Sequence, residues 1–513
     1  MTSAVTAPNS AKAGSKEWIA LAVLALPLLL VSMDVSVLYF AVPFISRDLS
    51  ATATQQLWIF DIYGFVLAGL LITMGSLGDR IGRRRLLIFG AAAFGLASIA
   101  AAYAQNPAEL IAARAILGIG GATLMPSTLA LIRNLFHDAG QRAKAIAMWS
   151  AVMMGGISIG PVLSGILLEH FWWGSVFLLN TPAMLLLLIL APVLLPEFRN
   201  PSAHRFDLLS SLLSLGAVLP VIFGIKRAAT DGFGLLAAAG IAAGLLIGWL
   251  FLSRQRRAED PMIDLAMFGN RAFTGSLLAN TIAMFALVGN AVFLTQYLQL
   301  ALGMSPLRAA LWSLAPSVVV AGAAPLATGL ASRHGRASVL GGGFLLGSAG
   351  FLLLTQLRPA SPLALVIIGS GLLATGLVMV MTLVADLVVG LVSPQRAGAA
   401  SALMETCSEF GGALGIALLG SIGAAVSRGS LSLPAGLTDG DAHEARQGLA
   451  GAVTVADRLP GGLGRQVLTA ARSAFTDGLD TVAWVGATLL ICAAVASVTL
   501  LREPTRRDGT GSS

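Results

Sequence analysis

The sequence predicts an all-α polytopic membrane protein. Apolar residue types make up 56% of the 513 residues and charged types only 11%. The apolar residues also gather in runs of about 20, the length at which a helix spans the hydrocarbon core of a bilayer. Backbone polar groups in lipid must bond internally, so each run is expected to be a helix.

We expect fourteen such spans, and therefore both chain ends on one side of the membrane. Short loops rich in Lys and Arg mark the cytoplasmic side. The short loops on the opposite side hold only Arg47, Lys226, Arg227, Arg308 and Arg358. We therefore expect a multi-pass protein of the cell (inner) membrane with both termini cytoplasmic. The predicted spans cover residues 18–44, 55–77, 86–104, 108–132, 143–168, 174–195, 207–226, 232–252, 272–300, 306–331, 337–356, 361–392, 398–426 and 480–501.

Composition and motifs exclude several other classes. The net charge of +7 does not indicate nucleic-acid binding, because the arginines lie in short loops rather than on one face. Cys407 and Cys492 lie in apolar runs, and the histidines lack metal-ligand spacing, so we expect neither a disulfide framework nor a metal. The sequence has no phosphate-binding G-x-x-x-x-G-K-[ST] motif and no nucleophile–base pair, so we expect no cofactor and no enzyme activity.

One charged stretch between the second and third spans has a distinctive pattern. It reads GSLGDRIGRRR from Gly75 to Arg85, with Asp79 as its only acid. Gly75 and Gly82 allow a sharp turn between two helix ends. The alternative is a positively charged cytoplasmic loop with incidental glycines.

Part of this stretch recurs later in the chain. Adding 253 to 77, 80, 82 and 83 leads to Leu330, Arg333, Gly335 and Arg336, while Ser332 replaces Asp79. A repeat of this kind is expected of a transporter built from two similar halves.

The charged stretch resembles the G-x-L-x-D-R-x-G-R-[RK] loop of the major facilitator superfamily, matched at Gly75, Asp79, Arg80, Gly82 and Arg83 among others. Four further segments are similar to those of its fourteen-span drug:proton antiporter branch, which includes quaternary-ammonium multidrug pumps. They lie at Met33–Pro43, at Gln55–Tyr63, at Arg114 with Gly118–Gly121, and at Gly156, Gly160, Pro161 and Gly165.

This resemblance implies two six-helix halves with two extra membrane helices between them. The expected divisions are a cytoplasmic tail 1–17, an N-terminal half 18–200, inserted helices 201–255, a C-terminal half 256–501 and a cytoplasmic tail 502–513. The resemblance further implies that the Gly75–Arg85 loop braces one half against the other. Gly156, Gly160 and Pro161 are expected to permit a bend in the fifth span.

Acidic residues within the predicted spans are candidate functional sites, because a charge is costly in hydrocarbon. Asp34, Asp61 and Arg114 fall at similar depth, so Arg114 can hold one carboxylate ionised while the other titrates. The alternative is a static Arg–Asp brace, which is a stronger alternative for Asp61 than for Asp34. Glu405 and Glu409, four residues apart, share a helix face and resist joint ionisation.

Three further predictions concern the acids' surroundings. Asp386 is the weakest candidate, with structural pairing as its alternative. The resemblance implies further acids where Met404 and, nearest in the tenth span, Ala321 stand, which leaves divalent-cation export open. Aromatic residues that could bind a flat cation by cation–π contact, or else face lipid and other helices, include Trp58, Tyr63, Trp149 and Phe293.

Residues 427–479 form one long outer segment, for which we expect a helical hairpin over the outer mouth rather than a disordered linker. The whole pattern predicts a monomeric proton-coupled exporter of small lipophilic organic cations. The alternatives are a dedicated exporter of a self-made metabolite or antibiotic, a membrane sensor and an intramembrane enzyme. A sensor is disfavoured because the sequence shows no cytoplasmic output domain.

Overall fold

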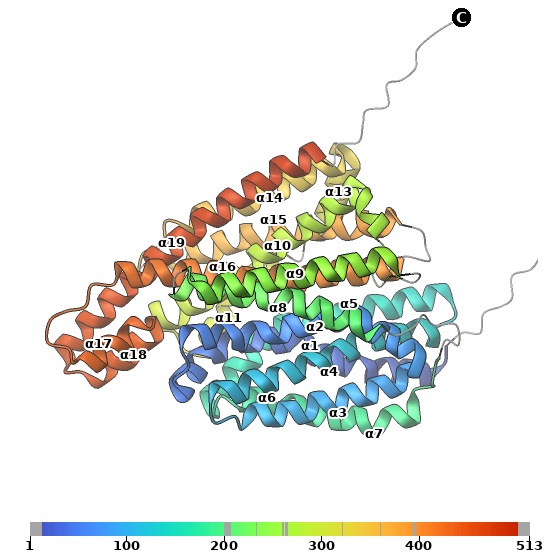
Figure 1. Cartoon of the computed structure of the whole chain (residues 1–513), viewed down its shortest axis with the longest axis horizontal. Helices are drawn as coiled ribbons and strands as arrows, with labels where there is room; N and C mark the ends of the chain where they lie inside the picture. Colours follow the sequence, from blue (N-terminus) through green and yellow to red (C-terminus); the bar gives the residue numbers. More distant parts are fainter. Residues whose placement is uncertain are drawn as a thin grey trace, which may run out of the picture.

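Helices are the only regular secondary structure in the computed structural model within the residues it describes, which are 13–199, 207–231, 233–258, 261, 265–320, 322–359, 361–392 and 397–500. Figure 1 shows long, roughly aligned helices, with the N-terminal half in blue to cyan and the C-terminal half in yellow to red. The N-terminal half contains α1 (Ser15–Leu49), α2 (Ala53–Ile81), α3 (Arg83–Ala102), α4 (Pro107–Leu135), α5 (Ala139–His170), α6 (Ser175–Leu178) and α7 (Asn180–Leu194).

Two inserted helices and the C-terminal half follow. The inserted pair is α8 (Leu208–Asp231) and α9 (Leu235–Arg257). The C-terminal half contains η1 (Leu265–Gly269), α10 (Arg271–Gln296), η2 (Tyr297–Ala301), α11 (Pro306–Ser313), α12 (Ala315–Val320), α13 (Ala323–His334), α14 (Arg336–Leu354), α15 (Leu363–Gly390), α16 (Ala397–Ser430), α17 (Asp439–Arg446), α18 (Leu449–Arg458) and α19 (Gly461–Leu500).

Every predicted span coincides with helix, although not always with one straight helix. Within the described residues, 11 helices are long and apolar enough to cross a membrane, or 12 if the two segments of α2, bent by 51°, count as one. The predicted seventh span contains a shorter apolar helix, Leu209–Gly224. The predicted tenth span is divided into α11, α12 and α13.

Local sequence explains where several helices begin. Thr52 caps α2 in a reciprocal arrangement with Gln55, and the Asn106 side chain accepts a hydrogen bond from the backbone of Glu109 before α4. Ser305 caps α11 just before Pro306. Such caps bond backbone N–H groups that the first helical turn leaves without partners.

The inserted pair α8–α9 lies along the seam between the halves, and Figure 1 shows it in green between them. Polar contacts fasten α8 to α2: the Thr73 and Ser211 hydroxyls hydrogen-bond, and the Ser214 hydroxyl donates to the Gly69 carbonyl at 3.4 Å. On the other side, Ile222 of α8 and Phe410 of α16 meet in a small apolar cluster.

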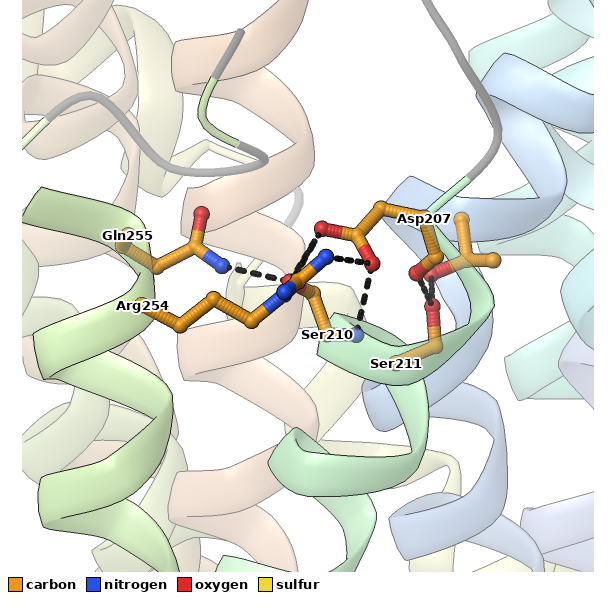
Figure 2. A network of polar contacts seen from close by, with 6 residues as sticks. Asp207, Ser210, Ser211, Arg254 and Gln255 are labelled. Carbon is orange, nitrogen blue, oxygen red and sulfur yellow. Dashed lines mark hydrogen bonds and ion pairs between the residues drawn. The ribbon is translucent and has the colours of Figure 1, made fainter. Parts of the chain in front are cut away.

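A polar network also joins the two inserted helices to each other, as Figure 2 shows. Arg254 pairs with Asp207 at 3.0 Å, and the Gln255 amide donates to Ser210 at 2.8 Å. These contacts lie at the end of α8 near its first residue and at the last turn of α9. The pair therefore forms one unit, hydrogen-bonded to the N-terminal half and in apolar contact with the C-terminal half.

The outer segment is an ordered helical hairpin, as predicted, and not a disordered linker. Thr438 caps α17 by accepting a hydrogen bond from the Asp441 backbone at 3.1 Å. The next helix, α18, packs on the outer part of α19 and touches α1. Figure 1 shows α17 and α18 at one end of the molecule.

Candidate functional site

A cavity of about 880 Å³, which we name the outer cavity, lies beneath the α17–α18 hairpin. It opens between α1 and α2 of one half and α10 and α16 of the other, with Phe60 and Phe293 among its lining residues. The Ser46 and Ser421 hydroxyls, from opposite halves, are buried there without hydrogen-bond partners in the described structure. This volume suits a drug-sized molecule.

Below this cavity, Arg114 of α4 forms a buried ion pair with Asp34 of α1. The Arg114 side chain is 0% exposed, and its Nε donates to the Ile59 carbonyl at 3.0 Å. Its guanidinium lies 4.7 Å from the centre of the Tyr63 ring. Three helices of the N-terminal half therefore surround this charge, and the cation–π contact and hydrogen bonds compensate its burial.

The structure brings Asp34, Asp61 and Arg114 together, as the sequence predicts. The ion pair shown by the structure joins Arg114 to Asp34, the acid for which a static brace is the weaker of the two sequence alternatives. Asp61 is 2% exposed and lies on α2, immediately after the Ile59 and Phe60 carbonyls that Arg114 contacts. The depth of each acid along its helix did not predict which of the two would pair with Arg114.

Glu405 and Glu409 are half-buried on α16. An ideal Cβ placed on Gly64 of α2 would lie 3.3 Å from Glu409 Oε2, so this carboxylate sits against the opposite half. Within the described residues, neither Glu405 nor Glu409 has a hydrogen bond or ion pair. Glu409 therefore lies at the boundary between the halves, with Glu405 about one turn away on the same helix, and neither is paired with a cationic side chain within the described residues.

Tyr39 of α1 connects these groups, and sequence reasoning did not single it out. Its electrostatic neighbours include Glu409, Asp61 and Arg114. Its ring lies 5.6 Å from that of Phe60, which lines the outer cavity. The only available signal was a tyrosine five residues after Asp34, too weak to assign a role.

The predicted aromatic cavity is not assembled as one site. Tyr63 packs on Arg114, and the Trp149 indole donates to Thr128 at 3.2 Å. Trp58 packs in an apolar cluster with residues of α2 and α4. Of the four predicted residues, Phe293 is the one that lines the outer cavity. Trp58 and Tyr63 lie on different sides of α2, as their spacing along one helix requires, and Trp149 and Phe293 lie on α5 and α10 of opposite halves.

The Gly75–Arg85 loop is a tight junction between α2 and α3. Gly82 has φ +115°, a conformation that favours glycine, and a Cβ there would lie 2.4 Å from Glu197 Oε1. Arg83 pairs with Asp79 at 2.6 Å. The Arg84 side chain donates to the Leu195 carbonyl at 3.0 Å.

These contacts differ from the expected brace between halves. In the part of the chain that the structure describes, the hydrogen bonds and ion pairs of the loop join α2 and α3 to the segment after α7, all within the N-terminal half. Asp79 is 42% exposed, and Arg80 is exposed at the surface.

The second copy of the loop has the same backbone feature but a different ion pair. Gly335 has φ +82° and separates α13 from α14. Arg336 pairs with Asp386 of α15 at 3.2 Å, and their side chains are 51% and 63% exposed. Asp386 is therefore not an acid buried in the membrane interior, and structural pairing is its observed role.

The glycines of the fifth span allow close packing rather than a break. Cβ atoms on Gly156 and Gly160 would lie 2.1 and 2.3 Å from the hydroxyls of Ser32 and Ser36 on α1. α5 continues through Pro161 as one helix from Ala139 to His170, so the expected bend does not interrupt it. Near its outer end, a Cβ on Gly165 would lie 2.7 Å from Leu307 Cα, in the opposite half.

No group of three or more potential metal ligands occurs among the described residues. The sequence predicts that Ala321 stands near the place of a family acid in the tenth span. Ala321 lies outside the described residues, so the structure does not test this prediction. Met404 contributes its backbone carbonyl to Asn280 at 3.4 Å.

Comparison with known proteins gives relatives along almost the whole chain. The multidrug efflux pump LfrA of Mycolicibacterium smegmatis is 44% identical over 488 residues, 95% of this chain and 97% of LfrA. The methyl viologen resistance protein SmvA of Salmonella typhimurium is 35% identical over 467 residues, 90% of this chain and 93% of SmvA. The tetracenomycin C resistance and export protein of Streptomyces glaucescens is 31% identical over 505 residues, 96% of this chain and 93% of that protein.

A solved structure supports the fold. The bacterial homologue of the human lysosomal transporter Spinster, inward-facing and occupied, has a TM-score of 0.65 at 18% identity and covers 95% of this chain and 97% of that chain. The family model described as Major Facilitator Superfamily matches residues 24–416. The chain is therefore a member of the major facilitator superfamily, and the relatives described here include multidrug efflux and antibiotic export pumps.

Proposed function

We propose that this protein is a proton-coupled antiporter that exports lipophilic organic cations. The observation that carries the proposal is the pair Glu405 and Glu409, half-buried at the boundary between halves and without a cationic partner in the described residues. Ionised carboxylates at such a site need a compensating charge. A proton and an organic cation can each supply it, and the two then compete.

The N-terminal site supports a division of roles. Arg114 compensates the charge of Asp34 in a fully buried pair, so this acid differs from Glu405 and Glu409. Asp61 lies next to the same group and is also buried. We assign proton coupling and cation binding to Asp34, Asp61, Glu405 and Glu409, with Arg114 as the supporting charge.

The proposed cycle is an exchange. A cation enters from the cytoplasm or inner leaflet and binds the ionised carboxylates. After the protein opens outward, protons neutralise the carboxylates and the cation leaves through the outer cavity under the hairpin. Movement of one charge across the membrane potential contributes about 2.3 kcal/mol per 100 mV, and the Asp79–Arg83 loop is proposed to control the change between states.

The relatives' names agree with this class of substrate. Methyl viologen, in the name of SmvA, is a flat organic dication. The proposal is tested with purified protein in proteoliposomes under an imposed proton gradient. Ethidium should move against its own gradient, and a proton-specific ionophore should stop it. Uptake that is unchanged when the gradient is collapsed would reject proton coupling.

A dedicated exporter of a self-made compound is the second candidate. It is favoured by the similarity to the tetracenomycin C resistance and export protein. The same vesicles distinguish the two: a broad exporter moves ethidium and several unrelated quaternary ammonium cations, whereas a dedicated exporter moves none of them.

A further inference from the structure

A second, much smaller cavity lies beside Asp34. Its volume is about 10 Å³ for the centre of a water-sized sphere, which is room for one water molecule. It lies between α1 and the point where α6 ends and α7 begins. Asp34 and Asn180 provide the polar side chains of its lining, and the other walls are apolar, including Val37 and Val176.

Both polar side chains have an oxygen to spare. Asp34 receives the Arg114 hydrogen bond on Oδ2, and no hydrogen bond to Oδ1 occurs within the described residues. Asn180 is 4% exposed, and its Nδ2 donates to Ser98 Oγ at 3.2 Å. Its Oδ1 likewise has no partner in the described part of the chain. Buried polar atoms of this kind are normally bonded to protein or to water.

The local sequence explains why Asn180 occupies this place. Leu179 separates α6 from α7, and Pro182 lies in the first turn of α7, where its missing N–H is tolerated. Asn180 is therefore the first residue of α7, at the break facing α1. The hydrogen bond to Ser98 of α3 fixes the orientation of its amide.

We propose that one water molecule occupies this cavity and that Asn180 is a positioning residue for Asp34. The water donates one hydrogen to Asp34 Oδ1 and the other to Asn180 Oδ1, and so replaces the solvent that an ionised carboxylate has outside the membrane. When Asp34 is protonated, its O–H donates to the same water. This inference rests on the proposed role of Asp34 in proton coupling.

Other charged and titratable groups near Asp34 also affect the equilibrium between its ionised and protonated forms. Arg114 of α4 pairs with it directly, and Tyr63 of α2 is an electrostatic neighbour of both Asp34 and Glu409. Asp61 of α2 lies in the same group. On α5, the Ser164 hydroxyl donates to the Val37 carbonyl of α1 at 3.0 Å. Asn180 adds an uncharged group, so its effect can be separated from theirs.

The test measures protonation of Asp34 directly. Infrared difference spectra of the purified full-length protein are recorded across pH, and the carboxylic-acid band that disappears in Asp34→Asn is assigned to Asp34. In Asn180→Leu, loss of one hydrogen bond to the ionised form should raise the midpoint of this band by about one pH unit. Val176→Leu adds a methylene that fills the cavity while keeping Asn180, and it should shift the midpoint in the same direction.

Thr181→Val is the matched control, because it removes a neighbouring buried hydroxyl that does not line the cavity. It should leave the midpoint where it is. Unchanged midpoints in both Asn180→Leu and Val176→Leu would overturn the inference while leaving the proposed function intact. If Asp34→Asn removes no titrating band, the proposed role of Asp34 fails and this inference fails with it.

Discussion

The two halves of this transporter hold their membrane acids in opposite ways. In the N-terminal half, Asp34 is paired with Arg114, and their side chains are 2% and 0% exposed. In the C-terminal half, Glu405 and Glu409 are half-buried and have no ion pair among the described residues. We infer from this difference that Glu405 and Glu409 are directly open to a mobile cation, whereas the charge of Asp34 is already compensated by Arg114 and must be neutralised in its presence.

The first prediction concerns stability, where the difference should be largest. Arg114→Met leaves Asp34 buried without its cation, so the free energy of unfolding should fall by about 3–5 kcal/mol. Glu409→Gln removes no ion pair and should leave it nearly unchanged. Thermal unfolding in detergent, with a denaturant titration of any variant that purifies folded, checks both. If both variants lost the same free energy of unfolding, the two halves would not differ in how they hold their acids.

The second prediction concerns the pH dependence of binding. Under the proposed exchange, protons and the drug cation compete for the same carboxylates, so ethidium binding should tighten as pH rises, by up to about tenfold per unit for one proton. Glu409→Gln should reduce this to under about threefold, because one competing site is gone. Leu414→Met on the same helix is an apolar control that should keep the wild-type slope. If both variants keep that slope, Glu409 is not a coupling residue.

The third prediction concerns the Gly75–Arg85 loop of the N-terminal half. Asp79→Ala removes the pair with Arg83 at a site far from the carboxylates. Because an exposed ion pair contributes about 0.2–1 kcal/mol, transport should fall by at most about fivefold, with ethidium affinity retained. Efflux and binding are measured on the same preparation. A loss of affinity as large as the loss of transport would contradict a conformational role.

The fourth and smallest effect is expected at the second copy of that loop. Arg336 and Asp386 are both more than half exposed, so Asp386→Asn should change the free energy of unfolding by no more than about 0.5 kcal/mol. Ethidium efflux should stay within twofold of wild type. A change as large as that of Asp79→Ala would mean that the two copies are equivalent.

The sequence predicted the helical segments well, because each depends on a local apolar run. It also predicted the neighbourhood of Asp34, Asp61 and Arg114 from depth along their helices. It did not predict which acid pairs with Arg114, since that depends on helix rotation about the long axis. The spacing of Trp58 and Tyr63 on one helix already turns them to different sides, whereas the separation of Trp149 and Phe293 depends on how the helices pack.

Two other features lay beyond sequence reasoning. Asp386 belongs to a long apolar run, but that run extends past the membrane interior, and Arg336 meets it there. Asn180 stands before Thr181 and Pro182, a signal of a helix break, but its proximity to Asp34 depends on how α7 packs against α1. Both the pairing of Asp386 with Arg336 and the proximity of Asn180 to Asp34 depend on contacts between segments that are distant in the sequence.

Exchange of an organic cation for protons at Glu405 and Glu409 is tested most directly by proton release when ethidium binds to the purified protein in weakly buffered detergent. Wild type should release at least one proton for each ethidium bound near neutral pH, and the double variant Glu405→Gln/Glu409→Gln should release clearly fewer. Equal release by the two proteins would contradict it and direct attention to Asp34 and Asp61.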